Sequence, residues 1–244
     1  MERARLSRYG VLSVTGDDAR DFLHAQLTND IAHLSAERAA LAGWCSAQGR
    51  LLATFLVIPA PAGFLLQLAR DLAPTVARRL AMFVLRTKVK IADDSAAWVQ
   101  YGCWGEERSG ADVVWADGGV SVRVGPLRFL ELRPASAPAL AAAVDETQWT
   151  LQEIRAGRPL ITAATQDKFV PQMVNLEKLG AVDFHKGCYP GQEIVARAQY
   201  RGKVKRRMVQ LPVPPGVRLA PGEAFEGGIV VDSAAGEALA VVPA

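Results

Sequence analysis

The spacing of apolar residues along this chain predicts a mixture of helices and strands. Apolar residues recur at helical spacing in the segments 19–31 and 71–83. Helices are also expected in the alanine-rich segment 135–146 and in 149–156, which ends before a glycine. Short apolar runs, bounded by glycine, proline or polar residues, predict strands in 11–14, 41–69, 88–91, 97–102, 120–124, 129–132, 205–211, 228–232 and 238–242. Helices and strands that follow each other without strict alternation indicate an α+β protein.

One long uncharged stretch, 51–69, is long enough to be compared with a membrane-spanning helix. Pro59 and Gly63 interrupt its middle, and a proline inside a helix removes a hydrogen bond and clashes with the preceding turn. Two strands, 51–58 and 64–69, joined by a turn explain the same residues better. We therefore expect a hairpin here and no membrane segment.

The composition fits a soluble globular protein. Of the 244 residues, 50% are hydrophobic by type and 22% are charged, which is the balance of a packed domain and not of a disordered chain. The three cysteines, Cys45, Cys103 and Cys188, are too few and too scattered for a disulfide framework. The basic N-terminal residues precede an apolar run that is too short for an export signal. A cytoplasmic location is therefore expected.

The formal net charge of +3 hides an uneven distribution of charge. The segment 194–222 contains no Asp or Glu, and its basic residues are Arg197, Arg201, Lys203, Lys205, Arg206, Arg207 and Arg218. Such a block attracts an anion, whether phosphate, carboxylate or nucleic acid. No aromatic residue is interleaved after Tyr200, so the stacking platforms of single-strand binders are missing. This disfavours a nucleic acid as a direct partner.

The densest polar cluster is 185–193, with the sequence His-Lys-Gly-Cys-Tyr-Pro-Gly-Gln-Glu. It places Cys188 on a tight, glycine-flanked loop two residues after Lys186. A positive charge near a thiol lowers the pKa of that thiol and favours the reactive thiolate. The alternative interpretation is a buried cysteine in a structural turn. The surrounding Gly, Pro, Gln and Glu residues favour the functional one.

Other chemistry for the same cysteine finds less support in the sequence. A zinc site with His185 lacks two further ligands, because neither Cys45 nor Cys103 has a C-x-x-C partner, and we predict no metal. A nucleophilic cysteine–histidine pair stays open, with His24, His33 or His185 as the base, although the spacing gives it no support. Phosphate-binding loops of the P-loop or dinucleotide-binding type are absent from the sequence.

Several segments of the chain resemble blocks of one known family. The signature K-G-C-Y-x-G-Q-E stands at 186–193, and further similar blocks occur in the expected order at 22–30, 44–50, 169–176 and 194–206. On these residues the chain resembles the YgfZ-type folate-binding family, relatives of the aminomethyltransferase (T-protein) of the glycine cleavage system. The resemblance spans most of residues 9–210.

The resemblance implies a T-protein-like fold, with lobes around a central hole. It implies a discontinuous ferredoxin-like folate-binding lobe in 1–42 and 110–203, a second α/β lobe in 43–109 and a C-terminal β-barrel domain in 204–244. Only 37 residues (244 − 207) follow Arg207, fewer than family members commonly have. We therefore expect a shortened barrel.

The resemblance also implies tetrahydrofolate, or a one-carbon derivative of it, as the bound cofactor. Trp149 falls where the family has the second of two folate-binding tryptophans, and Tyr9 replaces the first. Arg197 and Arg201 are candidate partners for the glutamate carboxylates of the folate, because guanidinium groups match carboxylates bidentately. Cys188 and Lys186 are the candidate reactive pair.

From these features we expect an accessory protein that binds tetrahydrofolate and supports the assembly or repair of iron–sulfur clusters, including those of tRNA-modifying enzymes. Its partners would be folate and iron–sulfur enzymes or assembly proteins, and it would not be a classical enzyme. The alternative is a folate-dependent aminomethyl transferase, for which Asp30 and Glu153 are candidate acid–base groups.

Overall fold

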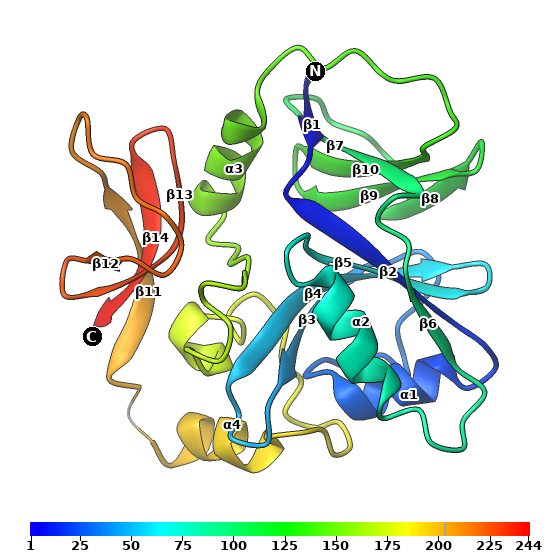
Figure 1. Cartoon of the computed structure of the whole chain (residues 1–244), viewed down its shortest axis with the longest axis horizontal. Helices are drawn as coiled ribbons and strands as arrows, with labels where there is room; N and C mark the ends of the chain where they lie inside the picture. The colour runs from blue at the N-terminus through cyan, green and yellow to red at the C-terminus, as the bar shows by residue number, and fades with distance from the viewer. Residues whose placement is uncertain (203) are drawn as a thin grey trace. The chain divides into compact units, whose positions relative to one another are not determined.

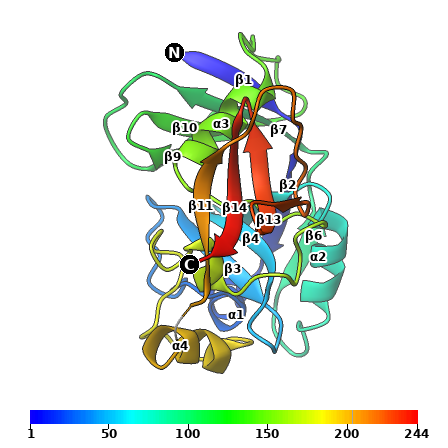
Figure 2. The ribbon, with the colours of Figure 1, turned by 90° about the vertical axis from the view of Figure 1, so that its left-hand side faces the viewer.

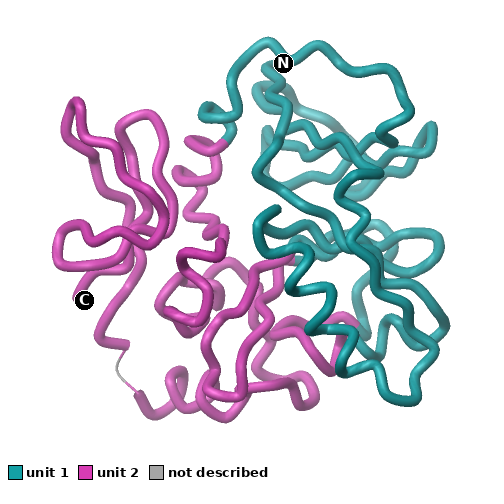
Figure 3. Tube along the Cα trace, in the orientation of Figure 1, with its two compact units in different colours: residues 1–22, 32–40, 56–149 teal, residues 23–31, 41–55, 150–244 magenta. Residues whose placement is uncertain are grey.

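Figure 1 shows the chain as a computed structural model that describes residues 1–202 and 204–244. The chain divides into two compact units, which Figure 3 colours separately. Unit 1 comprises 1–22, 32–40 and 56–149, and unit 2 comprises 23–31, 41–55 and 150–244. Each unit is therefore assembled from segments that are distant in the sequence.

The first sheet belongs to unit 1 and has the order β1–β7–β10–β9–β8. Its strands are β1 (Glu2–Leu6), β7 (Trp98–Trp104), β8 (Val113–Ala116), β9 (Gly119–Gly125) and β10 (Arg128–Pro134). Successive residues of β7 face opposite sides of the sheet. Tyr101 and Cys103 pack with Phe129 on one side, and Gly102 meets Trp149 on the other.

The second sheet has the order β3–β4–β5–β2–β6. Its elements are β2 (Tyr9–Thr15), α1 (Ala19–Gln26), β3 (Ala40–Cys45), β4 (Leu51–Ala60), β5 (Gly63–Ala69), α2 (Ala73–Ala81) and β6 (Lys90–Asp93). Without the added edge strand β3, this is the β-α-β-β-α-β order of a ferredoxin-like fold. The arrangement occupies 9–93.

The uncharged stretch forms the hairpin of β4 and β5, as predicted. All but the last residue of β4 are buried, which explains why the stretch carries no charge. The following helix α2 has Pro74 in its first turn and buries Val76, Ala77 and Leu80 at helical spacing. In the part of the chain that the structure describes, no helix has both the length and the apolar character to cross a membrane.

The third sheet lies in unit 2 and is an open, shortened barrel. Its order is β11–β14–β13–β12, formed by β11 (Arg206–Pro212), β12 (Ala224–Phe225), β13 (Gly228–Ala234) and β14 (Glu237–Pro243). Figure 2 shows β11, β14 and β13 side by side. Three of the four strands coincide with the predicted ones.

The remaining helices are α3 (Glu146–Arg155), the short 3-10 helix η1 (Pro171–Val174) and α4 (Gln192–Tyr200). The predicted helix over 135–146 is wrong, since only its last residue is helical. The main chain there bonds to distant backbone instead: the amide of Ala135 donates to the carbonyl of Ala97, just before β7, and the amide of Ala143 donates to the carbonyl of Arg3 in β1. The helix α4 was not expected from the sequence.

Candidate functional site

The signature loop, which we define as residues 183–191 of unit 2, begins with a turn built by Asp183. The Oδ1 atom of Asp183 accepts hydrogen bonds from the amides of His185 (2.7 Å) and Lys186 (3.1 Å). The amide of Asp183 itself donates to the carbonyl of Thr28 at 2.9 Å. Local side-chain bonding of this kind gives the backbone a fixed turn in place of a helix or strand.

Lys186 fastens the signature loop to the C-terminal end of α1. Its Nζ donates to the carbonyl of Leu27 at 2.7 Å and to the carbonyl of His24. Carbonyls at a helix C-terminus lack partners within the helix, and the helix dipole favours a cation there. The Nζ also lies 4.9 Å from the centre of the Tyr189 ring. Lys186 is therefore a helix-capping residue as well as a neighbour of Cys188.

Burial changes the acid–base behaviour of Lys186, which is only 9% exposed. Desolvation lowers the pKa of its ammonium from 10.5 to about 8, because the charged form loses hydration. Attraction to Asp30, Asp183 and Cys188 opposes this shift. The ammonium can therefore release a proton in mildly alkaline solution.

Two glycines let the signature loop approach the turn between β3 and β4. Gly49 and Gly191 both have a positive φ, +71° and +78°. A Cβ on Gly191 would lie 2.6 Å from the Cα of Gly49 and would overlap the carbonyl oxygen of Ser46. A Cβ on Gly49 would lie 2.8 Å from the Cβ of Ile194. The segments 44–50 and 186–193 therefore need glycine where their backbones meet.

The segment 169–176 links the start of β4 to α4. The amide of Leu51 donates to the carbonyl of Phe169 at 2.7 Å. The Nε2 of Gln172, which is fully buried, donates to the carbonyl of Val195 at 2.7 Å. Within unit 2, segments that resemble the family therefore pack around one loop.

Arg207 joins this region to the C-terminal sheet. Its Nη1 donates to the carbonyl of Gln172 at 2.8 Å, to the Oδ1 of Asn175 at 3.1 Å and to the Oε1 of Glu177. The Nδ2 of Asn175 donates in turn to the carbonyl of Met208 at 2.8 Å. Arg207 is therefore a structural clamp and not a solvated surface charge.

The other basic residues of the block differ in exposure. Arg206 is partly buried and its Nη2 donates to the carbonyl of Gly227 at 3.0 Å, whereas Lys205 and Arg218 are exposed. Arg197 on α4 and Arg201 at its C-terminus are exposed and one helical turn apart, so both guanidinium groups are accessible to an anion. Lys203 lies outside the described residues.

The three cysteines meet different surroundings. Cys188 is exposed on the signature loop, whereas Cys45 and Cys103 are buried. Burial raises the pKa of the Cys45 thiol to about 12, and it also raises the pKa of the Cys103 thiol. Only Cys188 among the three is therefore accessible to a reagent or a partner.

The two aromatic residues expected to bind folate belong to unit 1. Trp149 is 2% exposed, and its ring lies against Gly102, where any Cβ would overlap it. Tyr9 is 6% exposed, and its carbonyl accepts a hydrogen bond from the Nε2 of Gln100 at 3.0 Å. Because Gln100 and Gly102 alternate along β7, they face the same side of the sheet. Both aromatic residues therefore lie near that side of unit 1.

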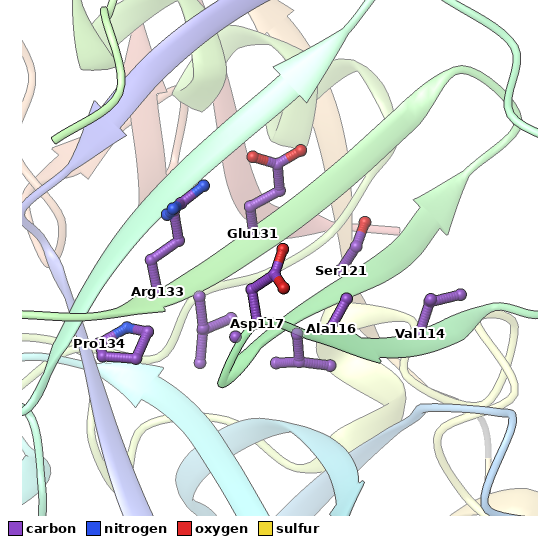
Figure 4. A pocket seen from close by; sticks show the side chains of 10 residues that line it. Val114, Ala116, Asp117, Ser121, Glu131, Arg133 and Pro134 are labelled. Carbon is purple, nitrogen blue, oxygen red and sulfur yellow. The ribbon is translucent and has the colours of Figure 1, made fainter. Parts of the chain in front are cut away.

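Unit 1 also contains a cavity of about 200 Å³ on β8, β9 and β10 (Figure 4). Among the residues that line it are Ser121 of β9, Glu131 and Arg133 of β10 and Asp117 of the turn between β8 and β9. None of the predicted site residues lines this cavity. The cavity is therefore separate from the predicted reactive and folate-binding residues.

Sequence reasoning named His24 and Asp30 separately and missed that their side chains form a pair beside the signature loop. The Nδ1 of His24 lies 3.2 Å from the Oδ1 of Asp30, in a pair that is about three-quarters buried. The Nε2 of the same ring lies 3.7 Å from the position that a Cβ on Gly187 would occupy. Both residues occur in the segment 22–30. Because they are six residues apart, their contact can be recognised only once the position of the end of α1 is known.

The arrangement of sheets and helices has a solved counterpart. The aminomethyltransferase T of the glycine cleavage system from Bartonella henselae matches 99% of this chain and 78% of its own, with a TM-score of 0.70 and 17% identity. The chain therefore has the aminomethyltransferase T fold, as the resemblance implied.

Sequence relatives narrow the class further, although no family model matches the chain. The tRNA-modifying protein YgfZ of Edwardsiella ictaluri is 34% identical over 231 residues, covering 85% of this chain and 70% of the relative. The protein of the same name from Vibrio vulnificus is 30% identical over 221 residues, covering 84% and 68%. The chain belongs to the YgfZ family.

Proposed function

We propose that the chain is a tetrahydrofolate-binding accessory protein of the cytoplasm. In this role it supports the assembly or repair of iron–sulfur clusters, including the clusters of tRNA-modifying enzymes. The relatives' name, tRNA-modifying protein, supports a link to tRNA modification. The observation that carries the proposal is the exposed thiol of Cys188 on a loop fastened at both ends.

The thiol suits contact with a cluster or with a protein that carries one. Thiolates are the usual ligands of iron–sulfur clusters. Lys186 and Gly191 hold the backbone on either side of Cys188, so its Sγ can meet a partner with little loss of conformational freedom. Iron–sulfur enzymes or assembly proteins are the proposed partners.

The residues proposed to hold folate fit it in different ways. Arg197 and Arg201 are exposed, one turn apart, and suit the carboxylates of a glutamate tail. Tyr9 and Trp149 are buried in unit 1, so contact with a pterin needs a change in the side chains that cover them. Bound folate would supply a carrier for one-carbon groups, while the chain's own residues bind and orient it.

Calorimetric titration with tetrahydrofolate tests this part of the proposal. We expect saturable binding that weakens about ten-fold in the double variant Arg197→Ala, Arg201→Ala, because each lost charged hydrogen bond contributes roughly 1.5–3 kcal/mol before solvent screening. Arg218→Ala removes another exposed arginine of unit 2 and is the matched control. Absence of saturable binding to the unchanged chain would exclude folate as the cofactor.

Rescue of cells that lack the protein tests the thiol. We expect Cys188→Ser to leave iron–sulfur enzyme activity at the level of the deletion, whereas His185→Gln, which removes a neighbouring exposed side chain, restores it. Full rescue by the serine variant would refute a working role for this cysteine.

The second candidate function is a folate-dependent aminomethyl transferase, which the T fold favours. Its candidate acid–base groups are both paired: Asp30 with His24 at 3.2 Å, and Glu153 with Arg158 at 3.4 Å. Each carboxylate is therefore already engaged by a basic side chain of the same chain. Folate-dependent turnover of an aminomethyl donor would favour the transferase over the accessory protein.

A further inference from the structure

We propose that the cavity on β8, β9 and β10 binds a small zwitterion, namely an α-amino acid with a short apolar side chain. The proposal goes beyond the function above, since the cavity lies within unit 1 and shares no residue with the proposed thiol and folate sites. It rests on the charges that line the cavity, on the strand register that positions them and on the size of the cavity.

The strand register puts the polar side chains of the cavity on one face of the sheet. Glu131 of β10 pairs with Ser121 of β9, which pairs in turn with Val114 of β8. Arg133 lies two residues after Glu131, so its side chain faces the same side. Figure 4 shows Ser121, Glu131 and Arg133 projecting to that side, together with Asp117 from the turn between β8 and β9.

The guanidinium group of Arg133 favours a ligand with a negative charge. Among the described residues it has no hydrogen-bond or ion-pair partner, and its Nε atom is buried. A buried donor without an acceptor destabilises the folded chain, because the donor loses its hydration without replacement. A carboxylate in the cavity would accept hydrogen bonds from Nε and one Nη, which is the bidentate arrangement that guanidinium groups favour.

Asp117 contributes the opposite charge to the same cavity. Its carboxylate is exposed and has no hydrogen-bond or ion-pair partner in the part of the chain that the structure describes. Arg133 and Asp117, both described residues, therefore line one cavity without forming an ion pair with each other. A ligand that carries an ammonium and a carboxylate matches both charges, whereas a ligand with carboxylates alone meets the negative charge of Asp117.

The other polar groups of the cavity wall are engaged within the protein. The Nη2 of Arg108 donates to the Oε1 of Glu131 at 2.9 Å, and its Nη1 donates to the Oγ of Ser121 at 3.1 Å. The Oε2 of Glu131 also lies 4.0 Å from the Nε of Arg3. Since cationic side chains balance the charge of Glu131, Arg133 and Asp117 are the charged groups left for a ligand.

The size of the cavity limits the ligand to a small molecule. Its volume is about 200 Å³, below the roughly 300–1,000 Å³ of sites for cofactors and drug-sized molecules, whereas a cavity of about 150 Å³ holds benzene. Gly119 keeps part of this space open, because a Cβ there would lie 3.6 Å from the Cα of Arg133. Val114, Ala116 and Pro134 offer apolar contacts to a short side chain. An amino acid of the size of alanine or valine fits these limits.

Titration of the isotope-labelled full chain with L-valine, followed through its amide NMR signals, tests the proposal. We expect saturable shifts at 114–121 and 131–133 at concentrations up to about 10 mM, because so small a ligand binds with a roughly millimolar dissociation constant. Isovalerate, which lacks the ammonium, and isobutylamine, which lacks the carboxylate, should each bind about ten-fold more weakly than valine. Absence of saturable shifts in these segments, or equal binding of valine and isovalerate, would overturn the proposal.

Three variants of the full chain assign the binding to the cavity. Arg133→Gln removes the guanidinium, and Asp117→Asn removes the carboxylate with a residue that tolerates the positive φ of 51° at this turn. Each should weaken the binding of valine about ten-fold, because a charged hydrogen bond is lost. Ala116→Leu keeps both charges and fills part of the cavity from an exposed position on the edge strand β8, so it should abolish the saturable shifts.

The matched control is Arg86→Gln, which removes an exposed arginine of unit 1 outside the cavity and should bind valine like the unchanged chain. If Arg133→Gln does not fold, Asp117→Asn and Ala116→Leu still decide the question, because both positions are exposed. Unchanged binding of valine in Asp117→Asn and Ala116→Leu would overturn the proposal. None of these variants alters Cys188 or the residues proposed to hold folate, so the result does not depend on the proposed function.

Discussion

The ammonium of Lys186 and the thiol of Cys188 are two residues apart, yet one is buried and the other is exposed. The sequence predicted that the lysine tunes the thiol. The structure adds a second task, because the same ammonium closes the C-terminal end of α1. A substitution at Lys186 therefore changes both the electrostatics of the thiol and the anchoring of the loop.

Replacement of Lys186 by methionine should destabilise the chain. The variant loses the charged hydrogen bonds to the carbonyls of His24 and Leu27. Its free energy of unfolding should therefore be lower by about 2 kcal/mol. Urea denaturation measures it. Lys178→Met, at an exposed lysine of the same unit, is the control and should change little. Equal stability of both variants would contradict the capping role.

The stability of the chain should also depend on pH through Lys186. Its pKa is lowered to about 8 in the folded protein from 10.5, so between these values the unfolded chain binds more protons. The free energy of unfolding of the unchanged chain, minus that of Lys186→Met, should therefore rise between pH 8 and pH 10.5. Titrating groups that both chains share cancel in this difference. A flat difference over this range would contradict the shift.

At the scale of elements, the signature loop and the turn between β3 and β4 depend on the close approach of Gly49 and Gly191. This explains why two distant segments carry glycine at these positions, which the sequence alone could not explain. The turn, the loop and α4 should behave as one rigid element.

Replacement of Gly191 by alanine should cost about 3 kcal/mol of stability, because the Cβ meets the backbone of residues 46 and 49 at a positive φ. Gly180→Ala is the matched control. Gly180 has a similar φ of +67° but no atom within 4 Å of its Cβ position, so only the backbone strain of about 1 kcal/mol remains. Thermal or urea unfolding that ranks the two variants equally would refute the close approach.

Elements with a strong local pattern could be predicted from the sequence. The hairpin of β4 and β5, the helix α2 and the strands β11, β13 and β14 follow from apolar periodicity and turn residues. The conformation of 135–146 could not be predicted, because amides of this segment bond to backbone carbonyls that are distant in the sequence. The helix α4 begins after Gly191, which has a left-handed backbone conformation. No periodic pattern in the sequence indicates that a helix begins there.

The residues of the candidate site likewise divide into those that the sequence could locate and those that it could not. Cys188 and Lys186 could be located from their loop sequence, since glycine, proline and charge are local signals. The pairing of His24 with Asp30 could not, because the end of α1 decides whether residues six apart meet. The partners of Lys186 are main-chain carbonyls, which leave no trace in the sequence.

At the scale of the whole molecule, the C-terminal sheet is joined to the rest of unit 2 by two arginines of different kinds. Arg207 is partly buried and contacts Gln172, Asn175 and Glu177, whereas Arg155 makes an exposed pair with Glu237. Side chains that hold several partners away from solvent contribute more than exposed pairs. The clamp of Arg207 should therefore decide how firmly the sheet is held.

Replacement of Arg207 by alanine should lower the free energy of unfolding by about 2 kcal/mol and speed proteolytic cleavage near 206–212. Arg155→Ala, which breaks only the exposed pair, should leave both measurements close to those of the unchanged chain. Greater sensitivity to the loss of Arg155 would show that the surface pair holds the sheet.

The division of the chain into interleaved segments bears on the order in which a newly synthesised chain can fold. Unit 1 is complete once residue 149 has left the ribosome, but 23–31 and 41–55 belong to unit 2 and must wait for 150–244. Until then the last turn of α1 lacks Lys186, its cap, and Gly49 lacks Gly191, its neighbour. The signature loop, which arrives late, is the segment that lets these earlier residues reach their final surroundings.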